Sequence, residues 1–329
     1  MGISIIGTGS YVPEKIMTNF DLEKIVNTND EWIRTRTGIT ERRIAAPEQQ
    51  VSDLGLEACR KALAMGDTRA EDVDLIVLSS TSPEYTFPST ACALQRKLGN
   101  TRGVCFDVQA ACSGFIFSLE TARSFMIANP ALKRVLVVGS EKMSAVVDWT
   151  DRDTCVLFGD AASAALLASG DEFEDCFVGC KMGTDGAYLD RLLIPAGGSG
   201  MPATFDTVEQ HLHFLKMDGQ AIFRLAVCKM YECSKELMSE KGIAADAIDW
   251  MVPHQANIRI MNAAADRLGV PREKVFANVN LYGNTCAATI GLALDEMLQQ
   301  NLLKKGQMIL LTAVGGGLTW GSTLIRWPF

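Results

Sequence analysis

Short apolar runs rich in β-branched residues alternate along the chain with longer segments whose apolar positions recur at helical intervals. The run Leu75–Leu78 is of the first kind. The segment Gly114–Ile127 is of the second kind, with these apolar residues on one helical face: Phe115, Leu119, Ala122 and Met126. Alternation of this kind favours strands that are covered by helices on both faces. The pattern therefore predicts an α/β fold.

The apolar and helical segments occur twice in the same order. Three pairs of segments resemble each other: Ala70–Leu78 and Ala245–Pro253, Val104–Val108 and Val275–Val279, and Arg134–Ser140 and Gln307–Ala313. Because the offset within each pair is nearly constant, we predict a duplicated α/β unit. The apolar pattern breaks near Ser169–Asp175, which predicts an N-terminal half over residues 1–173 and a C-terminal half over residues 174–329. Without a Pro- or Ser-rich linker between them, we expect the halves to share an interface.

Composition and charge narrow the class of protein. The 329 residues carry a net charge of −8, which argues against general affinity for nucleic acid. The ten cysteines include no CxxC pair and no Cys/His cluster of zinc spacing, so we predict free thiols and no metal. The N-terminus lacks the basic segment and cleavage site of a secretory signal, and no apolar run reaches the ~20 residues of a membrane span. We therefore expect a protein of the reducing cytoplasm that does not act at a membrane.

Cys112 is the leading candidate for chemistry. It follows the strand-like run Val104–Val108 and stands where the helical segment Gly114–Ile127 begins. Unpaired N–H groups at a helix N-terminus carry partial positive charge, which favours a thiolate and therefore a nucleophile. The simpler alternative is a structural thiol, because cysteines are common in protein cores.

The chain has only three histidines, so the search for a partner of Cys112 is short. His254 follows a strand-like run and a proline, and Asn284 lies in a loop that opens a helix. Alone, each has a structural explanation, as a hydrogen-bonding histidine and a capping or turn asparagine. In the duplicated pattern, however, Cys112 and Asn284 take nearly equivalent positions. A pseudo-twofold axis would then bring the three side chains to one pocket, whereas His211 and His213 alternate like strand residues and are interpreted as structural.

Three further segments have both a structural and a functional interpretation. Val314–Gly321 is either a tight glycine turn or a loop whose backbone N–H points at a developing oxyanion. Asp30–Ile39 is either an amphipathic helix with a turn, or an aromatic and basic surface for a base and its phosphates. Gly7–Val12 resembles half a dinucleotide fingerprint but lacks its third glycine, so we do not expect NAD binding.

Together these segments resemble one family. The motifs are Asp30-Glu-Trp-Ile, Arg36-Thr-Gly-Ile, Ala110-Ala-Cys-Ser-Gly, Thr150-Asp-Arg, Phe158-Gly-Asp, Val252-Pro-His-Gln-Ala-Asn and Gly283-Asn-Thr. Over nearly its whole length the chain resembles the β-ketoacyl-acyl-carrier-protein synthase III family, the initiating condensing enzymes of dissociated (type II) fatty-acid synthesis. The resemblance implies a thiolase-like fold of five layers, α-β-α-β-α, with duplicated halves related by a pseudo-twofold axis.

The resemblance also implies an acyltransferase reaction. A short acyl-CoA, with acetyl-CoA the expected primer, condenses with malonyl-acyl carrier protein to give 3-ketoacyl-acyl carrier protein, CoA and CO2. No metal or cofactor is implied, and the expected partners are the acyl carrier protein, acyl-CoA and a second copy of the chain in a homodimer. Cys112 would accept the acyl group. His254 and Asn284 would bind the malonyl thioester carbonyl and stabilise the enolate left by decarboxylation.

Other residues receive roles from the same resemblance. The backbone N–H groups of Cys112 and Gly316 would form the oxyanion hole, and Phe87 would line the acyl pocket and limit primer length. The residues implied for coenzyme A are Thr28, Trp32, Arg36 and Arg152, with Trp32 stacked on the adenine. The stretch implied for carrier-protein docking is Gln255, Ala256, Asn257, Ile258 and Arg259, with Arg259 facing the acidic partner.

The chain departs from the family pattern at two places. Asp266 stands where the family often has a basic residue, with Arg267 beside it, so carrier affinity or orientation is expected to differ. Val314 precedes the glycines where a larger aromatic residue is common, and Leu318 follows them, which predicts a wider or reshaped acyl pocket. The alternative function is that of a specialised thiolase-like condensing enzyme of secondary metabolism. A catalytically dead homologue is disfavoured because Cys112, His254 and Asn284 are all present.

Overall fold

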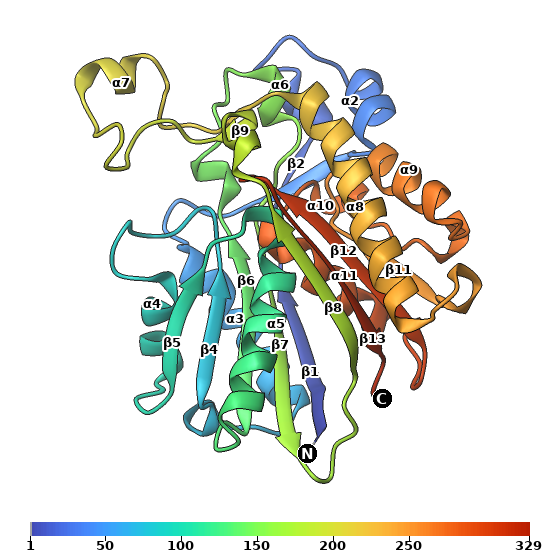
Figure 1. The fold of residues 1–329 in the computed structure, drawn as a ribbon. Coiled ribbons are helices and arrows are strands. Elements are labelled where there is room, and N and C mark those ends of the chain that lie inside the picture. Colours follow the sequence, from blue (N-terminus) through green and yellow to red (C-terminus); the bar gives the residue numbers. More distant parts are fainter. Residues whose placement is uncertain (1) are drawn as a thin grey trace.

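Figure 1 shows a computed structural model of the chain, which describes residues 2–329. Two large sheets stack on each other, with helices between them and on both outer faces (Figure 1). Within residues 2–329, no helix is both long and apolar enough to cross a membrane.

The first sheet has the strand order β1-β7-β6-β4-β5. Its strands are β1 (Gly2–Tyr11), β4 (Leu75–Ser79), β5 (Val104–Val108), β6 (Arg134–Glu141) and β7 (Ala161–Gly170). Strand β4 runs parallel to β5 and β6, and β7 runs antiparallel to β1 and β6. Every residue of β7 is buried, as expected for a strand that is covered on both faces.

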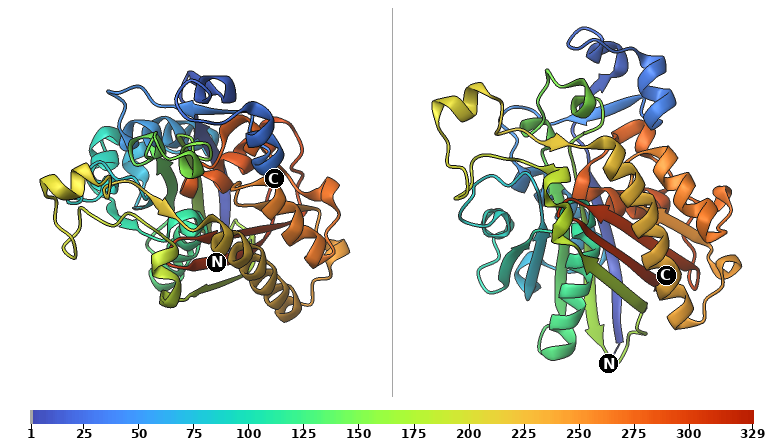
Figure 2. Two further views of the ribbon diagram at one scale, coloured as in Figure 1. Left: turned by 90° about the horizontal axis from the view of Figure 1, so that it is seen from above. Right: turned by 45° about the horizontal axis from the view of Figure 1, so that its top comes forward.

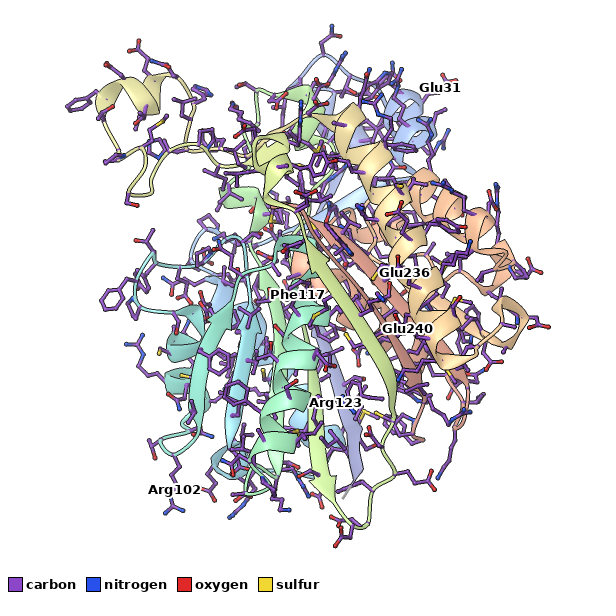
Figure 3. The ribbon with its side chains drawn as sticks, viewed as in Figure 1. Glu31, Arg102, Phe117, Arg123, Glu236 and Glu240 are labelled. Carbon is purple, nitrogen blue, oxygen red and sulfur yellow. The ribbon has the colours of Figure 1, made fainter. Side chains whose placement is uncertain are left out.

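The second sheet has the strand order β11-β12-β13-β8. Its strands are β8 (Phe177–Thr184), β11 (Trp250–Pro253), β12 (Met308–Gly315) and β13 (Thr319–Arg326). Strands β11 and β12 are parallel, and the remaining pairs are antiparallel. At the β8 edge, Lys181 pairs with Glu236 and Glu240 of the helix that covers the sheet; both glutamates are labelled in Figure 3.

The main helices form three layers. Helices α3 (Val51–Met65) and α4 (Thr90–Leu98) cover the outer face of the first sheet. Helices α5 (Gly114–Ala128) and α11 (Thr289–Gln299) lie between the sheets, where each contacts both of them. Helix α8 (Gly219–Lys241) covers the outer face of the second sheet, with α9 (Ile258–Leu268) packed against it. The predicted order of five layers is confirmed.

The two sheets share one apolar core. A continuous cluster of buried side chains includes Phe115 and Leu119 of α5, Ile290 of α11, Val137 of β6 and Leu311 of β12. Close approach of backbones holds the halves together at the end of this core. At Gly139 of β6, a Cβ atom would lie 2.4 Å from the carbonyl oxygen of Ala287, so no larger residue fits there.

Two of the three repeated segment pairs form equivalent elements. The segments Ala70–Leu78 and Arg134–Ser140 end in the neighbouring parallel strands β4 and β6, and their counterparts end in the neighbouring parallel strands β11 and β12. The third pair differs. Val104–Val108 forms β5, whereas Val275–Val279 makes a single parallel bridge from Val275 to Met251 and then turns into α10 (Val279–Tyr282). The second sheet therefore ends at β11 and has one parallel strand fewer.

Smaller elements cap the end of the molecule where the parallel strands finish. They are β2 (Lys15–Thr18), α1 (Asn19–Leu22), α2 (Asp30–Thr37), β3 (Glu41–Ile44), α6 (Arg152–Cys155), β9 (Leu192–Leu193), α7 (Phe205–Glu209) and β10 (Lys216–Met217). The short 3-10 turns, found along the whole chain, are Ala70–Asp72, Ala111–Ser113, Met143–Ala145, Gly186–Arg191, Ala245–Ala247, Arg272–Lys274 and Cys286–Ala288.

Helix α7 stands clear of the body in every view of Figures 1 and 2, and its Phe205 is 97% exposed.

Candidate active site

Three polar side chains from different elements meet in one cavity of about 500 Å³. Cys112 comes from the first half of the chain, and His254 and Asn284 come from the second half; all three line this cavity. The convergence expected from the duplicated sequence is therefore present. Most other lining residues are apolar, including Leu192, Ile222, Phe223, Met230 and Leu318.

The position of Cys112 follows from how α5 begins. Cys112 lies in the 3-10 turn Ala111–Ser113, directly before α5, and its side chain is only 7% exposed. The Ser113 hydroxyl donates to Thr319 Oγ1 at 2.7 Å, and the Thr319 hydroxyl donates to the Ala110 carbonyl at 2.9 Å. These bonds tie the turn to the second sheet, so Cys112 is held by both halves.

The surroundings of Cys112 favour its thiolate. The Cys286 thiol, whose sulfur lies 3.5 Å from the Cys112 sulfur, is the main group that holds the Cys112 pKa well below its ordinary value. Burial opposes this shift, and His254 and Asn284 lower the pKa further. The helix start predicted this direction for the pKa, and the groups that lower the pKa here are side chains of the second half.

His254 is placed by the second sheet. It follows β11, and its backbone N–H donates to the Thr312 carbonyl at 2.8 Å, which continues the parallel pairing with β12. Its ring nitrogen Nδ1 lies 2.7 Å from the Thr289 hydroxyl, which leaves Nε2 as the nitrogen that faces the cavity. Because a hydroxyl can donate or accept, Thr289 can serve either tautomer of the ring.

Asn284 is fixed by its backbone and by its own carboxamide. Its N–H donates to the Leu157 carbonyl at 2.8 Å, and its carbonyl accepts from the Gly159 N–H at 3.1 Å. The side-chain oxygen accepts from the Cys286 N–H at 2.9 Å. Because the oxygen is occupied in this way, the Nδ2 hydrogens are the carboxamide atoms left to donate into the cavity.

The wall behind Cys112 contains residues that sequence analysis did not select. Cys286 also lines the cavity, and its sulfur lies 3.2 Å from the Thr81 hydroxyl. Thr81 donates in turn to Glu141 at 3.1 Å. Glu141 is fully buried, and burial raises its pKa. The position of Cys286 two residues after Asn284 is the one sequence signal that could have pointed to it.

The glycine loop after β12 packs directly against Cys112. A Cβ atom at Gly315 would lie 2.7 Å from the Cys112 backbone nitrogen, which explains the glycine there. Gly316, predicted to supply an oxyanion-hole N–H, lines the cavity, as do the two departures from the family pattern, Val314 and Leu318.

A basic and aromatic cluster lies beside α9. Above the ring of Trp32 lie two guanidinium groups, that of Arg36 at 5.0 Å and that of Arg152 at 4.9 Å from the ring centroid. The nearby Thr28 hydroxyl is buried and has no hydrogen-bond partner within residues 2–329. Asn257 links the cluster to the cavity, because it lines the cavity and its amide donates to the Arg36 carbonyl at 2.9 Å.

One predicted role is wrong and another stays a prediction. Phe87 is 88% exposed and is absent from the cavity lining formed by residues 2–329, so its role in an acyl pocket stays a prediction. The Gln255 side chain cannot be part of a docking surface, because it is 1% exposed. Its amide instead donates to the carbonyls of Pro253 and Phe276 and braces the chain beneath His254.

The remaining histidines lie outside the cavity. His211 Nδ1 lies 2.9 Å from a carboxylate oxygen of Asp148, and His213 Nε2 lies 3.0 Å from the Thr207 hydroxyl. Both contacts secure the segment that carries α7. Within residues 2–329 no group of three or more His, Cys, Asp or Glu side chains is arranged to hold a metal ion.

The comparisons with known proteins show which family the chain resembles. Residues 106–186 match the family model of 3-oxoacyl-[acyl-carrier-protein] synthase III, and residues 238–327 match the model of its C-terminal part. A β-ketoacyl-[acyl-carrier-protein] synthase III from Caldanaerobacter subterraneus is 47% identical, over 98% of this chain and 97% of its own length.

Solved structures of the same group superpose over the full length. The Aquifex aeolicus 3-oxoacyl-[acyl-carrier-protein] synthase III is 43% identical, with a TM-score of 0.90 over 99% of this chain and 100% of its own. The Pseudomonas aeruginosa enzyme is 37% identical, with a TM-score of 0.91 over 100% of this chain and 99% of its own.

The lowered pKa of Cys112 predicts how its reactivity depends on pH. In the folded protein, alkylation of Cys112 by iodoacetamide should remain fast well below the ordinary thiol pKa of about 8.5, because the thiolate persists until pH falls through the lowered pKa. Quantitative mass spectrometry of the Cys112 peptide measures the rate at each pH. The control is the same peptide in urea-unfolded protein. If the curve of alkylation rate against pH had the same midpoint in the folded and the unfolded chain, the site would not activate the thiol.

Proposed function

This chain belongs to the 3-oxoacyl-[acyl-carrier-protein] synthase III family, and we propose that Cys112, His254 and Asn284 carry out its condensation reaction. An acyl-CoA and malonyl-acyl carrier protein give 3-ketoacyl-acyl carrier protein, CoA and CO2, the step that initiates type II fatty-acid synthesis. The observation that carries the proposal is a buried thiol, with its pKa held low, that shares one cavity with an imidazole and a carboxamide.

The first half of the reaction is acyl transfer. The Cys112 thiolate attacks the carbonyl carbon of the acyl-CoA thioester, and the carbonyl oxygen becomes an oxyanion. The proposed donors to this oxyanion are the backbone N–H groups of Cys112 and Gly316, which the packing of Gly315 against Cys112 brings into range. The thioester between CoA and the acyl group then breaks, CoA leaves as a thiol after taking a proton, and the acyl group stays on Cys112.

The second half is decarboxylation followed by carbon–carbon bond formation. When malonyl-carrier protein loses CO2, negative charge develops on its thioester oxygen. With the Thr289 hydroxyl donating to Nδ1, His254 Nε2 carries the hydrogen and would donate to that charge together with Asn284 Nδ2; each such donor lowers a barrier by about 3 kcal/mol. The enolate carbon attacks the acyl-Cys112 carbonyl, and Cys112 leaves again as the thiolate that its surroundings favour.

The cluster at Trp32 supports the proposed coenzyme A site. The indole offers a flat face to an adenine ring, and the guanidinium groups of Arg36 and Arg152 offer charge to phosphates. The buried Thr28 hydroxyl has no partner within residues 2–329 and would be available to hydrogen-bond a bound phosphate. Because Asn257 joins this cluster to the cavity, a CoA bound at Trp32 would direct its thioester toward Cys112.

The outer surface of α8 and α9 is the proposed docking surface for the carrier protein. Three exposed arginines lie on these helices, and two of them, Arg224 and Arg267, line a depression of about 670 Å³; the third is Arg259. Asp266 is neutralised locally, because its carboxylate pairs with Arg272 at 2.6 Å. This side of the molecule therefore stays basic and suits an acidic partner in spite of the acidic residue in its sequence.

The exposure of Phe87 supports the proposed homodimer. A phenylalanine that is 88% exposed beside the edge strand β5 cannot shape the pocket of its own chain. In a dimer formed at that edge, Phe87 would instead reach the acyl pocket of the second copy, which would retain its predicted role in limiting primer length. Val104 of β5, 59% exposed, adds apolar area to the same edge.

The remaining expectations follow from the same assignment. The ten free cysteines support the cytoplasm as the working compartment, and acetyl-CoA is the proposed primer. A specialised synthase of secondary metabolism is less well supported, because a relative that is 47% identical over nearly the whole chain carries the name of the initiating enzyme. A competition among acetyl-, isobutyryl- and longer acyl-CoAs for condensation with malonyl-carrier protein would show whether the small residue Val314 lets the site accept larger acyl primers.

Removal of a donor should separate the two half-reactions. For His254→Ala and for Asn284→Ala, we expect malonyl-carrier decarboxylation to fall by about 100-fold or more, because each variant loses a donor to the enolate. Acylation of Cys112 by acetyl-CoA should persist when it is measured above the ordinary thiol pKa of about 8.5, where the thiolate no longer depends on these donors. Intact mass reports the acyl-enzyme, and labelled CO2 reports the decarboxylation. Cys112→Ser is the control and should not be acylated; a His254→Ala protein that lost acylation but kept decarboxylation would contradict the assigned roles.

Charge reversal on α9 should weaken carrier binding alone. For Arg259→Glu, we expect the KM for malonyl-carrier protein to rise by about tenfold, with less effect at high salt, because a rim charge then repels the acidic partner. The rate of Cys112 acylation by acetyl-CoA should not change. The control is Arg102→Glu, which makes the same charge change at the opposite end of the molecule, where Arg102 is labelled in Figure 3. It should change neither the KM for malonyl-carrier protein nor the rate of Cys112 acylation. Equal effects of the two variants would argue against the α8 and α9 surface.

A further inference from the structure

We propose that Cys112 and Cys286 form a redox-modification site, in which a hydroperoxide that enters the cavity converts the two thiols into a reversible disulfide. The proposal goes beyond the condensation reaction and relies on it only where enzyme activity is measured.

The geometry of the two sulfurs carries the proposal. They lie 3.5 Å apart, in contact but not bonded, and the cysteines belong to different halves of the chain. Both line the cavity, so a small oxidant that reaches one of them reaches the other, although Cys112 is 7% exposed and Cys286 only 2%. A disulfide requires the sulfurs to approach from 3.5 Å to about 2.05 Å.

The charges around the pair assign a role to each sulfur. Cys112 carries the thiolate, which is the form that attacks a peroxide, because its donors hold its pKa down. Cys286 stays protonated, because the neighbouring Cys112 and burial both raise its pKa, and the Glu141 carboxylate raises it further. Cys112 is therefore the first sulfur to be oxidised and Cys286 the sulfur that resolves it.

The chemistry balances in two steps. The Cys112 thiolate attacks one peroxide oxygen, the O–O bond breaks, and the products are a Cys112 sulfenic acid and an alkoxide or hydroxide that takes a proton from water. The Cys286 sulfur then attacks the Cys112 sulfur and the S–O bond breaks. The hydroxyl group leaves as water with the proton of Cys286, for which the Thr81 hydroxyl at 3.2 Å and Glu141 beyond it offer a path. The two thiols lose two electrons, and the peroxide is reduced to an alcohol or to water.

The second thiol changes what oxidation does to the enzyme. A sulfenic acid without a partner proceeds to sulfinic and sulfonic acids, which ordinary thiol reductants do not reverse. A disulfide between Cys112 and Cys286 stops that sequence and reopens when a dithiol reductant is supplied. In a reducing compartment such a disulfide would be transient, as is usual for redox-sensing pairs.

Oxidation of a second cysteine pair must be distinguished from oxidation of Cys112 and Cys286. The sulfurs of Cys92 and Cys105 lie 3.6 Å apart, and both residues lie outside the cavity lining. Oxidation of that pair would change the mass of the protein in the same way. Cys92→Ser removes it, and because Cys92 is an exposed residue of α4 this variant serves as the parent for the test.

The test compares full-length Cys92→Ser with Cys92→Ser/Cys286→Ser. Each protein is treated with hydrogen peroxide, blocked with N-ethylmaleimide and mapped by peptide mass spectrometry. Condensation activity is read before and after dithiothreitol, relative to the untreated sample of the same variant. In the parent we expect a peptide that links Cys112 to Cys286 and lacks two hydrogens, together with recovery of activity. Without Cys286 we expect Cys112 with two or three added oxygens and at least about tenfold less recovery.

Several results would overturn the proposal. They are equal recovery in the two variants, a parent whose Cys112 is oxidised to sulfinic acid without the linked peptide, or a disulfide that joins Cys112 to a different cysteine. The mapping of the parent alone decides the matter if the double variant fails to fold. It also decides the matter independently of the proposed condensation, because the linked peptide is detected whether or not the protein turns over substrate.

Discussion

A buried sulfur can hold negative charge only if donors around it replace the water that burial removes. The groups that stabilise the negative charge on Cys112 come from the other half of the chain. They are the Cys286 thiol, His254 and Asn284. Burial alone would raise the pKa of this thiol and make it inert. The reactive form of Cys112 therefore depends on the packing of one half of the chain against the other.

The fold provides that packing through its central layer. Helices α5 and α11 lie between the two sheets and share one apolar core, and the 3-10 turns that precede them hold Cys112 and Cys286 in contact. The absence of a side chain at Gly139 and Gly315 lets the backbones approach closely enough for this contact. The same arrangement that activates the thiolate thus places a second sulfur within reach of it, so catalytic activation and sensitivity to oxidation have one structural cause.

Sequence analysis could predict features that depend on local pattern. Strand and helix periodicity predicted an α/β fold, the family resemblance predicted its five layers, and the internal repeat predicted that Cys112, His254 and Asn284 would meet. It missed features that depend on how the halves fit together. No local pattern shows that Cys286 touches Cys112, or that Gln255 turns inward to brace a loop. The exposure of Phe87 likewise depends on how its loop sits on the completed fold.

The central claim is that Cys112 is the nucleophile of a site assembled from both halves. Incubation of the full-length protein with acetyl-CoA, followed by intact-mass and peptide analysis, tests it most directly. The account predicts one acetyl group per chain, carried by Cys112 and discharged when malonyl-carrier protein is added. A protein that gained no acetyl group, or that carried it on any of the other cysteines, would contradict the account.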